Sequence, residues 1–569
     1  MANQVRESAY QLLVRLFART PLNFRVLCRQ FMLRVVDLEA LSIQADVAGY
    51  MGQFARVAIM FSFLHCLIAW AYSAPMQMAA HIGFAFHFEQ YLVATQMLMV
   101  GLFTVISWDA IFPDRRDILI LSPLPIRPHT ILFAKVCASL AILGMAMLAL
   151  NFTVGFVWSF FLSLPMGFVN GFLRTLAAYW ITMALASIFL YCAVLTLQGT
   201  MALVLPRRLF LRTSALLQLA AFGAFLGTYF MQGTVTSLEE LNSAASHTLL
   251  ASSPSFWFFG IFNQLRGVLP PELDWLALRA WTGLAIMVPS AAIALLLCYV
   301  RTMRKTVEEP DLVPAARGRH WELRIGSRLQ TAITLFSWRT LTRSRQHRVI
   351  LAFYLSIAFA IALAAIRGAL IAGATRPFTD VYPAITCTMM VFTVMGFRNV
   401  FSLPISLTAN WVLQTTQLRT PEHYIAAARR TLLLFAVLPV WCIAALLGLT
   451  YRPLPMVAGH LFLLAILGVL LADASLIGFA KVPFTCSLLP GNSNFQFTFW
   501  KTLGGLMIMC ILLVPAEMRA LHQTQQYAEL AAGMMAVSAG LWAFNRWRAR
   551  SAVLYFEEEP EEIILKLGL

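Results

Sequence analysis

The sequence predicts an all-α integral membrane protein. We expect about 12 transmembrane helices in two pseudo-repeated six-helix halves, each preceded by an amphipathic interfacial helix. The 569 residues are 60% hydrophobic and only 12% charged, whereas water-soluble domains average about 45–50% apolar and about 25% charged residues. The apolar residues also form long runs, and the basic residues gather between alternate pairs of these runs.

Twelve apolar runs approach the roughly 20 residues that a membrane-spanning helix needs. The even number places both termini on the same side of the membrane. The predicted spans are residues 55–73, 91–109, 136–158, 176–198, 215–232, 278–300, 349–371, 384–402, 431–450, 457–479, 502–517 and 528–545.

The distribution of basic residues sets the orientation of these spans. With the N-terminus in the cytoplasm, seven of the 42 Lys and Arg residues lie in outer loops and the other 35 lie in inner segments. Because inner loops of membrane proteins are enriched in Lys and Arg, this bias places both termini in the cytoplasm of a multi-pass protein of the cytoplasmic (inner) membrane. The net charge of +16 then reflects topology and contact with anionic membrane lipids, and no nucleic-acid partner is expected.

The chain reads as two related halves in parallel orientation, a common layout of transporters. In the second amphipathic segment, Leu335 and Phe336 are followed by Arg339, as Leu16 and Phe17 are followed by Arg19 in the first. The predicted parts are an N-terminal interfacial segment (1–54), a first six-span half (55–300) with a coupling loop (109–135) and an outer re-entrant loop (233–277), a linker with the second amphipathic helix (301–348), a second six-span half (349–545) and a cytoplasmic tail (546–569).

A polar break over residues 112–135 separates the second and third spans. Pro113 and the acidic residues after it favour a helix start, and three prolines from Pro123 onward stop that helix. An isolated helix shorter than about 12 residues is marginal in water, so we expect this one to lie on another protein in the cytoplasm. The alternative is a solvated loop that only marks topology. The candidate docking residues are Asp114, Arg115, Arg116, Asp117, Ile118, Leu119, Pro123, Leu124 and Pro125.

Two other loops stand out. Residues 397–430 lie at the corresponding place in the second half, and their Leu403-Pro404 pair is a looser counterpart of Leu124-Pro125. Residues 253–260, SPSFWFFG, are aromatic and follow a polar stretch. Since such a segment is unfavourable in bulk water, we expect it to dip back to the outer membrane interface, where Trp is favoured.

These segments resemble a known family. Residues 117–135, DILILSPLPIRPHTILFAK, and residues 253–260 resemble the coupling and re-entrant regions of membrane (permease) subunits of ABC exporters of the second type (ABC-2-type transporter permeases). The resemblance implies an exporter that moves an unidentified substrate by alternating access. It also implies that the coupling helix docks on a separate ABC ATPase. The second half departs from the pattern at its Leu-Pro loop and in its short outer loop, residues 518–527.

The sequence contains no GxxxxGK[ST] loop to cradle phosphates. ATP would therefore be bound by the partner, and the fused halves could accept two copies of that ATPase. No cofactor and no enzymatic activity are expected in this chain. No Ser-His-acid or Cys-His grouping can be assembled from neighbouring positions, although such groups can also meet in space.

Asp473 is an acidic residue well inside a predicted span, where a charge costs roughly 2.5–3.5 kcal/mol on insertion scales. It is a candidate pathway or proton-relay residue. Alternatively it pairs with Lys481, or forms a hydrogen bond between helices. His81, His87 and Glu89 lie near an outer interface, but their spacing matches no standard metal-ligand pattern, so no metal site is predicted.

Two other functions stay open at this point. One is a secondary transporter driven by an ion gradient, with Asp473 as its coupling residue. The other is an integral-membrane transferase that acts on lipid carriers. The transferase would need acid-rich polar clusters at one membrane face, which the sequence does not show.

Overall fold

The structure is a computed structural model of the whole chain. The residues that it describes are 22–36, 62, 78–107, 121, 123–124, 126–163, 168–231, 252–308, 326–373, 377–405, 410, 415, 421–451, 453–479, 481–485, 512–521, 523–551 and 553–554. These residues are helical, with turns between the helices and no strand among them. The chain divides into two compact units, residues 1–216 with 232–315 and residues 217–231 with 316–569.

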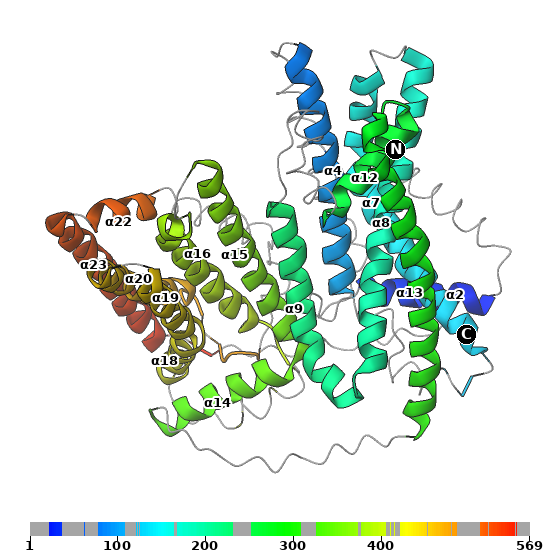
Figure 1. The fold of residues 1–569 in the computed structure, drawn as a ribbon. Helices are drawn as coiled ribbons and strands as arrows, with labels where there is room; N and C mark the ends of the chain where they lie inside the picture. The colour runs from blue at the N-terminus through cyan, green and yellow to red at the C-terminus, as the bar shows by residue number, and fades with distance from the viewer. Residues whose placement is uncertain are drawn as a thin grey trace, which may run out of the picture. The chain divides into compact units, whose positions relative to one another are not determined.

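The first unit is built from long apolar helices together with two shorter ones, α2 and α12 (Figure 1). Its central helix α8 packs on α4, α7, α12 and α13. The elements are α2 (Leu22–Val36), α4 (Met78–Ile106), α7 (Pro128–Ser163), α8 (Phe168–Val204), the start of α9 (Arg207–Met231), α12 (Pro254–Arg266), the 3₁₀ turn η2 (Pro271–Leu273) and α13 (Asp274–Glu308).

The second unit contains the rest of α9 and the helices that follow residue 316. Its core joins α16, α19, α20 and their neighbours around Met390, Phe401 and Leu464. The further elements are α14 (Arg328–Arg343), α15 (Arg345–Ile371), α16 (Pro377–Val400), α18 (Pro421–Leu432), the π-helical turn η3 (Leu433–Val437), α19 (Leu438–Tyr451), α20 (Leu454–Ser475), α22 (Val514–Ala520) and α23 (Thr524–Ser551).

Nine helices among the described residues are long and apolar enough to cross a membrane, and α9 adds a shorter apolar helix over residues 216–231. The prediction of a helical, multi-pass membrane protein is therefore confirmed. Ten of the 12 predicted spans fall on these helices, while residues 55–73 and most of 502–517 lie outside the described residues, apart from Ser62 and the start of α22. The count of 12 spans and the two-half repeat stay predictions.

Several helices extend beyond the apolar runs that predicted them. Helix α4 starts at Met78, before the expected residue 91, and α7 starts at Pro128, before the expected residue 136. Pro128 was expected in an extended segment, but proline is well tolerated in the first helical turn, where its missing N–H has no helical partner to lose. The longest apolar run thus locates a helix, and segments of mixed polarity before that run continue the same helix.

The aromatic segment at residues 253–260 forms most of the short helix α12. Pro254 occupies its first turn, and Gly267 ends it with φ 77°, the left-handed conformation that favours glycine. Phe256, Phe258 and Phe259 are fully buried, and α12 packs against α4, α8 and α13. The aromatic side chains are therefore covered by protein.

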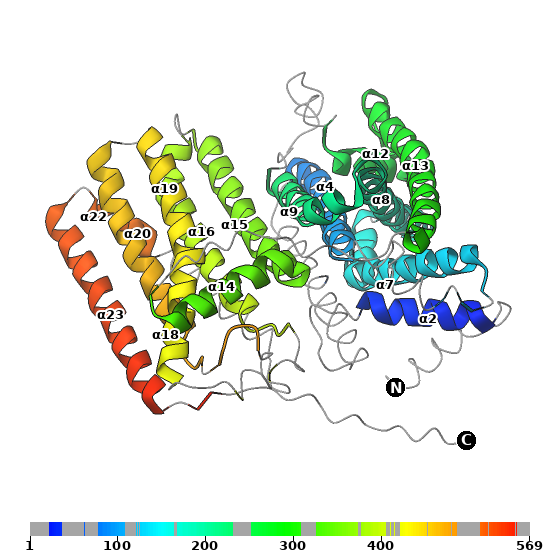
Figure 2. The ribbon, with the colours of Figure 1, turned by 90° about the horizontal axis from the view of Figure 1, so that it is seen from below.

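Both amphipathic segments contain helices. Helix α2 lies alongside α7 (Figure 2). Leu27 and Phe31 of α2 are buried against Ile131 and Ala134 of α7. Helix α14 starts with a capping box between Ser327 and Gln330, in which each residue satisfies a backbone N–H of the other. The second amphipathic helix was predicted within residues 301–348. In the structure α14 ends at Arg343 and α15 begins at Arg345, because the backbone of Ser344 between them is extended.

The contact between α12 and α13 depends on Gly260. A Cβ atom at this position would lie 2.8 Å from the backbone nitrogen of Ala277 and 2.8 Å from the Cβ of Leu276. We expect Gly260→Ala to lower the stability of the purified protein by about 1–3 kcal/mol, the usual cost of overpacking a dense interior. The measurement is the thermal unfolding midpoint in detergent.

Gly533→Ala in α23 is the matched control, because a Cβ there would meet no atom within 4 Å. It should leave the midpoint unchanged or raise it, since Ala favours a helix over Gly by about 1 kcal/mol. Equal midpoints for G260A and G533A would contradict the role assigned to Gly260.

Candidate functional site

Three carboxylates in the described part of the chain are buried: Glu89, Asp473 and Glu517. A buried charge is stable only when it is paired and hydrogen-bonded. Each of the three has such a partner, and each pair joins helices that are distant in sequence. These networks are the candidate sites of the molecule.

In the first unit, Glu89 of α4 pairs with α12. Its Oε1 accepts a hydrogen bond from Nη1 of Arg266 at 2.9 Å, and its Oε2 accepts one from Nδ2 of Asn263 at 3.0 Å. One residue further on, Nε2 of Gln90 donates to Oγ of Ser255 at 3.2 Å. The beginning and the end of α12 are thus both tied to α4, which holds the short helix inside the unit.

A chain of uncharged groups continues through the same unit. Tyr179 donates from its hydroxyl to Oδ1 of Asn151 at 2.6 Å, and Nδ2 of Asn151 donates to Oε1 of Gln96 at 2.8 Å. Gln96 in turn donates to Oγ of Ser187 at 2.8 Å. These bonds link α4, α7 and α8. A cavity of about 20 Å³ beside Gln96 and Asn151 is large enough for one water molecule.

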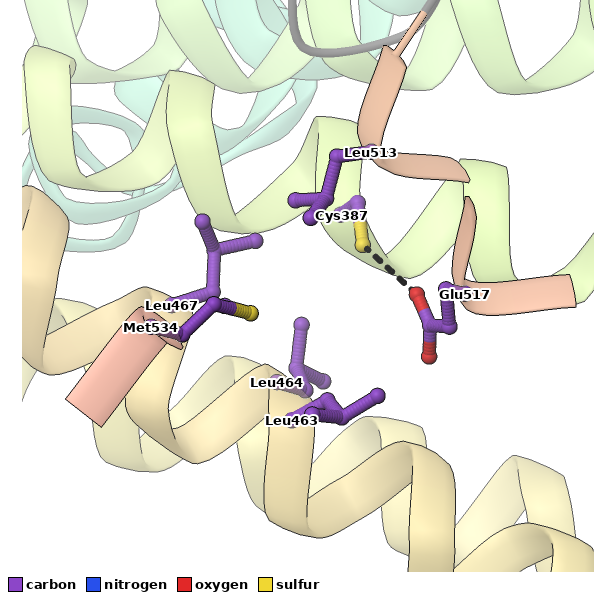
Figure 3. Close-up of a pocket in the computed structure, with 7 residues that line it drawn as sticks. All are labelled: Cys387, Leu463, Leu464, Leu467, Leu513, Glu517 and Met534. Atoms are coloured by element: carbon purple, nitrogen blue, oxygen red, sulfur yellow. Dashed lines mark hydrogen bonds between the residues drawn. The ribbon is translucent and has the colours of Figure 1, made fainter. Parts of the chain in front are cut away.

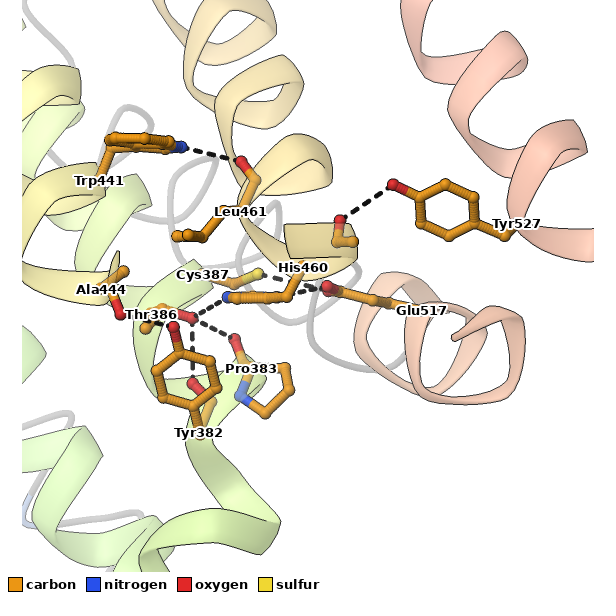
Figure 4. A network of polar contacts seen from close by, with 11 residues as sticks. Tyr382, Pro383, Thr386, Cys387, Trp441, Ala444, His460, Leu461, Glu517 and Tyr527 are labelled. Atoms are coloured by element: carbon orange, nitrogen blue, oxygen red, sulfur yellow. Dashed lines mark hydrogen bonds and ion pairs between the residues drawn. The ribbon is translucent and has the colours of Figure 1, made fainter. Parts of the chain in front are cut away.

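In the second unit, Glu517 of α22 pairs with His460 of α20 (Figure 4). Oε1 of Glu517 and Nδ1 of His460 form a short contact, and Nε2 of His460 lies 2.8 Å from Oγ1 of Thr386 on α16. The ring of Tyr382 packs on the imidazole of His460, with the two ring centroids 4.9 Å apart. The hydroxyl of Tyr382 donates to the carbonyl of Ala444 at 2.6 Å. The network joins α16, α19, α20 and α22.

The other oxygen of Glu517 faces a small apolar pocket (Figure 3). Its hydrogen-bonding contact is the thiol of Cys387, with Sγ 3.9 Å from Oε2. The space among the lining side chains is too narrow for a water molecule. The remaining lining residues are Leu463, Leu464, Leu467, Leu513 and Met534.

The third network lies at the C-terminal end of α20. Asp473 accepts two hydrogen bonds from Arg429 of α18, at 2.5 Å from Nε and 2.9 Å from Nη2. Its backbone carbonyl accepts from Nδ2 of Asn545 on α23 at 2.7 Å. Two parallel bonds from one guanidinium fix both geometry and charge, so this pair fastens α18, α20 and α23 together.

The predicted site residues stand as follows. Asp473 is buried as expected for a residue in a span, and its partner is Arg429 instead of Lys481. Pro123 and Leu124 form a turn in which Leu124 is exposed and its N–H donates to the carbonyl of Leu121 at 3.2 Å. Asp114, Arg115, Arg116, Asp117, Ile118, Leu119 and Pro125 lie outside the described residues.

Sequence reasoning did not select Glu89, Arg266 or Glu517 as site residues. Glu517 is the last residue of a predicted span, and Glu89 lies just before another. A carboxylate at the edge of a span is the signal that could have found both. Its partner could not be found in this way, because Arg266 is 177 positions from Glu89 in the sequence. No group of three metal-ligating side chains occurs among the described residues.

Comparisons with protein-family models, with curated proteins and with solved structures find no match to this chain. The long apolar helices of the described residues define the class as a helical, multi-pass membrane protein.

The pair of Glu89 and Arg266 can be tested by a double-mutant cycle. Arg266→Met leaves the carboxylate buried without its charged partner, and we expect a loss of about 3–5 kcal/mol in the free energy of unfolding. The double variant E89M/R266M should recover most of this loss, because two apolar side chains replace both charges. Thermal unfolding of the single and double variants measures the coupling. Additive losses would show that the pair does not hold α12 to α4.

Proposed function

We propose that this chain is the permease subunit of an ATP-driven exporter of the ABC-2 type, energised by a separate ATPase. In this proposal the long helices carry the substrate pathway, and the stretch between the second and third predicted spans receives the power stroke. The chain moves its substrate across the cytoplasmic membrane by alternating access. Both termini lie in the cytoplasm, and the fused chain accepts two ATPase copies.

The observation that carries the proposal is the short buried helix α12, directly before the long helix α13. The resemblance to ABC-2 permeases implies short re-entrant helices before the last span of a half. In a bilayer, backbone that does not cross the membrane is tolerated only where protein or a water-filled cavity surrounds it. Helix α12 meets this condition, because α4, α8 and α13 pack against it and nine of its 13 residues are buried.

A second supporting observation is the contact between α2 and α7. Lys135 is buried and its Nζ lies 5.1 Å from the ring centroid of Phe31 on α2, a favourable cation–π arrangement. Helix α7 directly follows the docking stretch. A displacement of that stretch by an ATPase would therefore act on α7 and α2 together.

The alternative of an ion-coupled transporter used Asp473 as its coupling residue. Asp473 forms two hydrogen bonds with Arg429, an arrangement that fastens helices, so we prefer the ATP-driven mechanism. A role of Asp473 in the pathway stays a prediction. Loss of transport on dissipating the proton gradient, with ATP intact, would favour ion coupling instead.

The docking of an ATPase is tested by replacing Ile118 and Leu119 with Asp. A charge on the apolar side of the short helix should prevent burial against a partner, because each unpaired charge costs several kcal/mol to desolvate. We expect co-purification of the ATPase with the tagged permease to fall at least tenfold. The amount of folded permease should not change, since the substituted residues are expected on the surface.

The matched control is Val268→Asp, which makes the same change at an exposed position in a predicted outer loop. It should leave co-purification unchanged. Undiminished co-purification with I118D/L119D would refute the docking proposal.

A further inference from the structure

The pair of His460 and Glu517 differs from the other buried pairs in the chemistry of its base. Glu89 and Asp473 are paired with arginines, whose guanidinium groups keep their proton in proteins. Glu517 is paired with an imidazole, which changes charge near neutral pH. Among the buried carboxylates of the described residues, Glu517 is therefore the one whose partner can gain or lose a proton.

The hydrogen-bond geometry allows two proton arrangements. If Thr386 donates to Nε2 of His460, the ring carries its proton on Nδ1 and donates it to Glu517. The pair then has one negative charge, which its burial disfavours. A hydroxyl has one proton to donate, and Oγ1 of Thr386 lies 3.0 Å from each of the carbonyls of Tyr382 and Pro383. When Thr386 donates to these carbonyls, it accepts a hydrogen bond from Nε2 of His460, which then carries a proton. The contact between Nδ1 of His460 and Oε1 of Glu517 needs a further proton between the two atoms, because each is an acceptor without it.

With both protons in place, the pair carries no net charge. It is then either an imidazolium with a carboxylate or a neutral imidazole with a carboxylic acid. Loss of the proton between Nδ1 and Oε1 would leave one negative charge inside the unit. The side chains of His460 and Glu517 are 2% and 3% exposed, so solvent would not stabilise that charge.

Among the residues that the structure describes, the surroundings of Glu517 offer no other compensating charge. Besides His460 of α20, the groups that face it are the thiol of Cys387 on α16 and the hydroxyl of Tyr527 on α23. The Tyr527 hydroxyl already donates to the carbonyl of Gly459 at 3.0 Å. On α22 itself, Arg519 is exposed and donates to the carbonyl of Pro515. The pocket at Oε2 is too narrow for water, and so for a hydrated ion.

We propose that His460 and Glu517 form a proton-binding site that holds one dissociable proton for as long as α22 is packed on α20. A net charge in this apolar setting costs several kcal/mol, so the proton leaves only when water reaches the pair. Separation of α22 from α20 and release of the proton are then linked events. This site is independent of the proposed ATPase contact, which lies on other residues.

The test counts the protons that are released when the purified full-length protein is unfolded in weakly buffered detergent. At about pH 8, well above the ordinary histidine pKa of about 6.5, the unfolded chain holds no proton on His460 or Glu517. The wild-type protein should therefore release about one proton more per molecule than Glu517→Gln, whose side chain has the same size and does not titrate.

The control is Asp473→Asn, which removes a buried carboxylate from an arginine pair and should release as many protons as the wild-type protein. If E517Q does not yield folded protein, the double variant H460F/E517L replaces it. This variant should also release about one proton fewer per molecule than the wild-type protein. Equal proton release from the wild-type protein and from the folded Glu517 variant would overturn the proposal. The proposal would also be overturned if D473N released about one proton fewer than the wild-type protein, because the effect would then not be specific to the histidine pair.

Discussion

The structure depends on one constraint: a charged group buried among these apolar helices must find its partner within the protein. In the hydrocarbon core there is no water to replace a missing hydrogen bond. Glu89, Asp473 and Glu517 are nearly completely buried and all three are paired. The helices are packed by apolar contacts, and each charged pair in addition requires two particular helices to lie side by side.

The short helices of the two units, α12 and α22, are held by different chemistry. In the first, α12 is held to α4 by the carboxylate of Glu89, which accepts from a guanidinium and an amide, and by the bond from Gln90 to Ser255. In the second, α22 is held through an imidazole and a carboxylate. Both short helices come directly before a long helix, α13 and α23 respectively.

This difference bears on the proposed transport function. An exporter driven by an ATPase needs stretches that transmit movement and stretches that hold their position. The contact of Lys135 with Phe31 couples α7 to α2, and the pair of Asp473 with Arg429 holds the end of α20 to α18. In the proposed mechanism, the contact of Lys135 with Phe31 would transmit a movement that starts in the docking stretch. The pair of Asp473 with Arg429 would keep α18 and α20 together.

The sequence by itself determined the class of fold, the places of ten helices and the aromatic character of α12. Hydrophobicity, proline and glycine act locally, so a run of neighbouring residues is enough to recognise them. The partners of the buried charges were decided only by the tertiary structure. Glu517 and His460 are 57 positions apart, and Glu89 and Arg266 are 177 apart. The sequence suggested Lys481 for Asp473 because it was near in the chain, whereas helix packing brought Arg429 to it from 44 positions away. A local pattern shows that a buried charge needs a partner, and the packing of distant helices decides which residue that partner is.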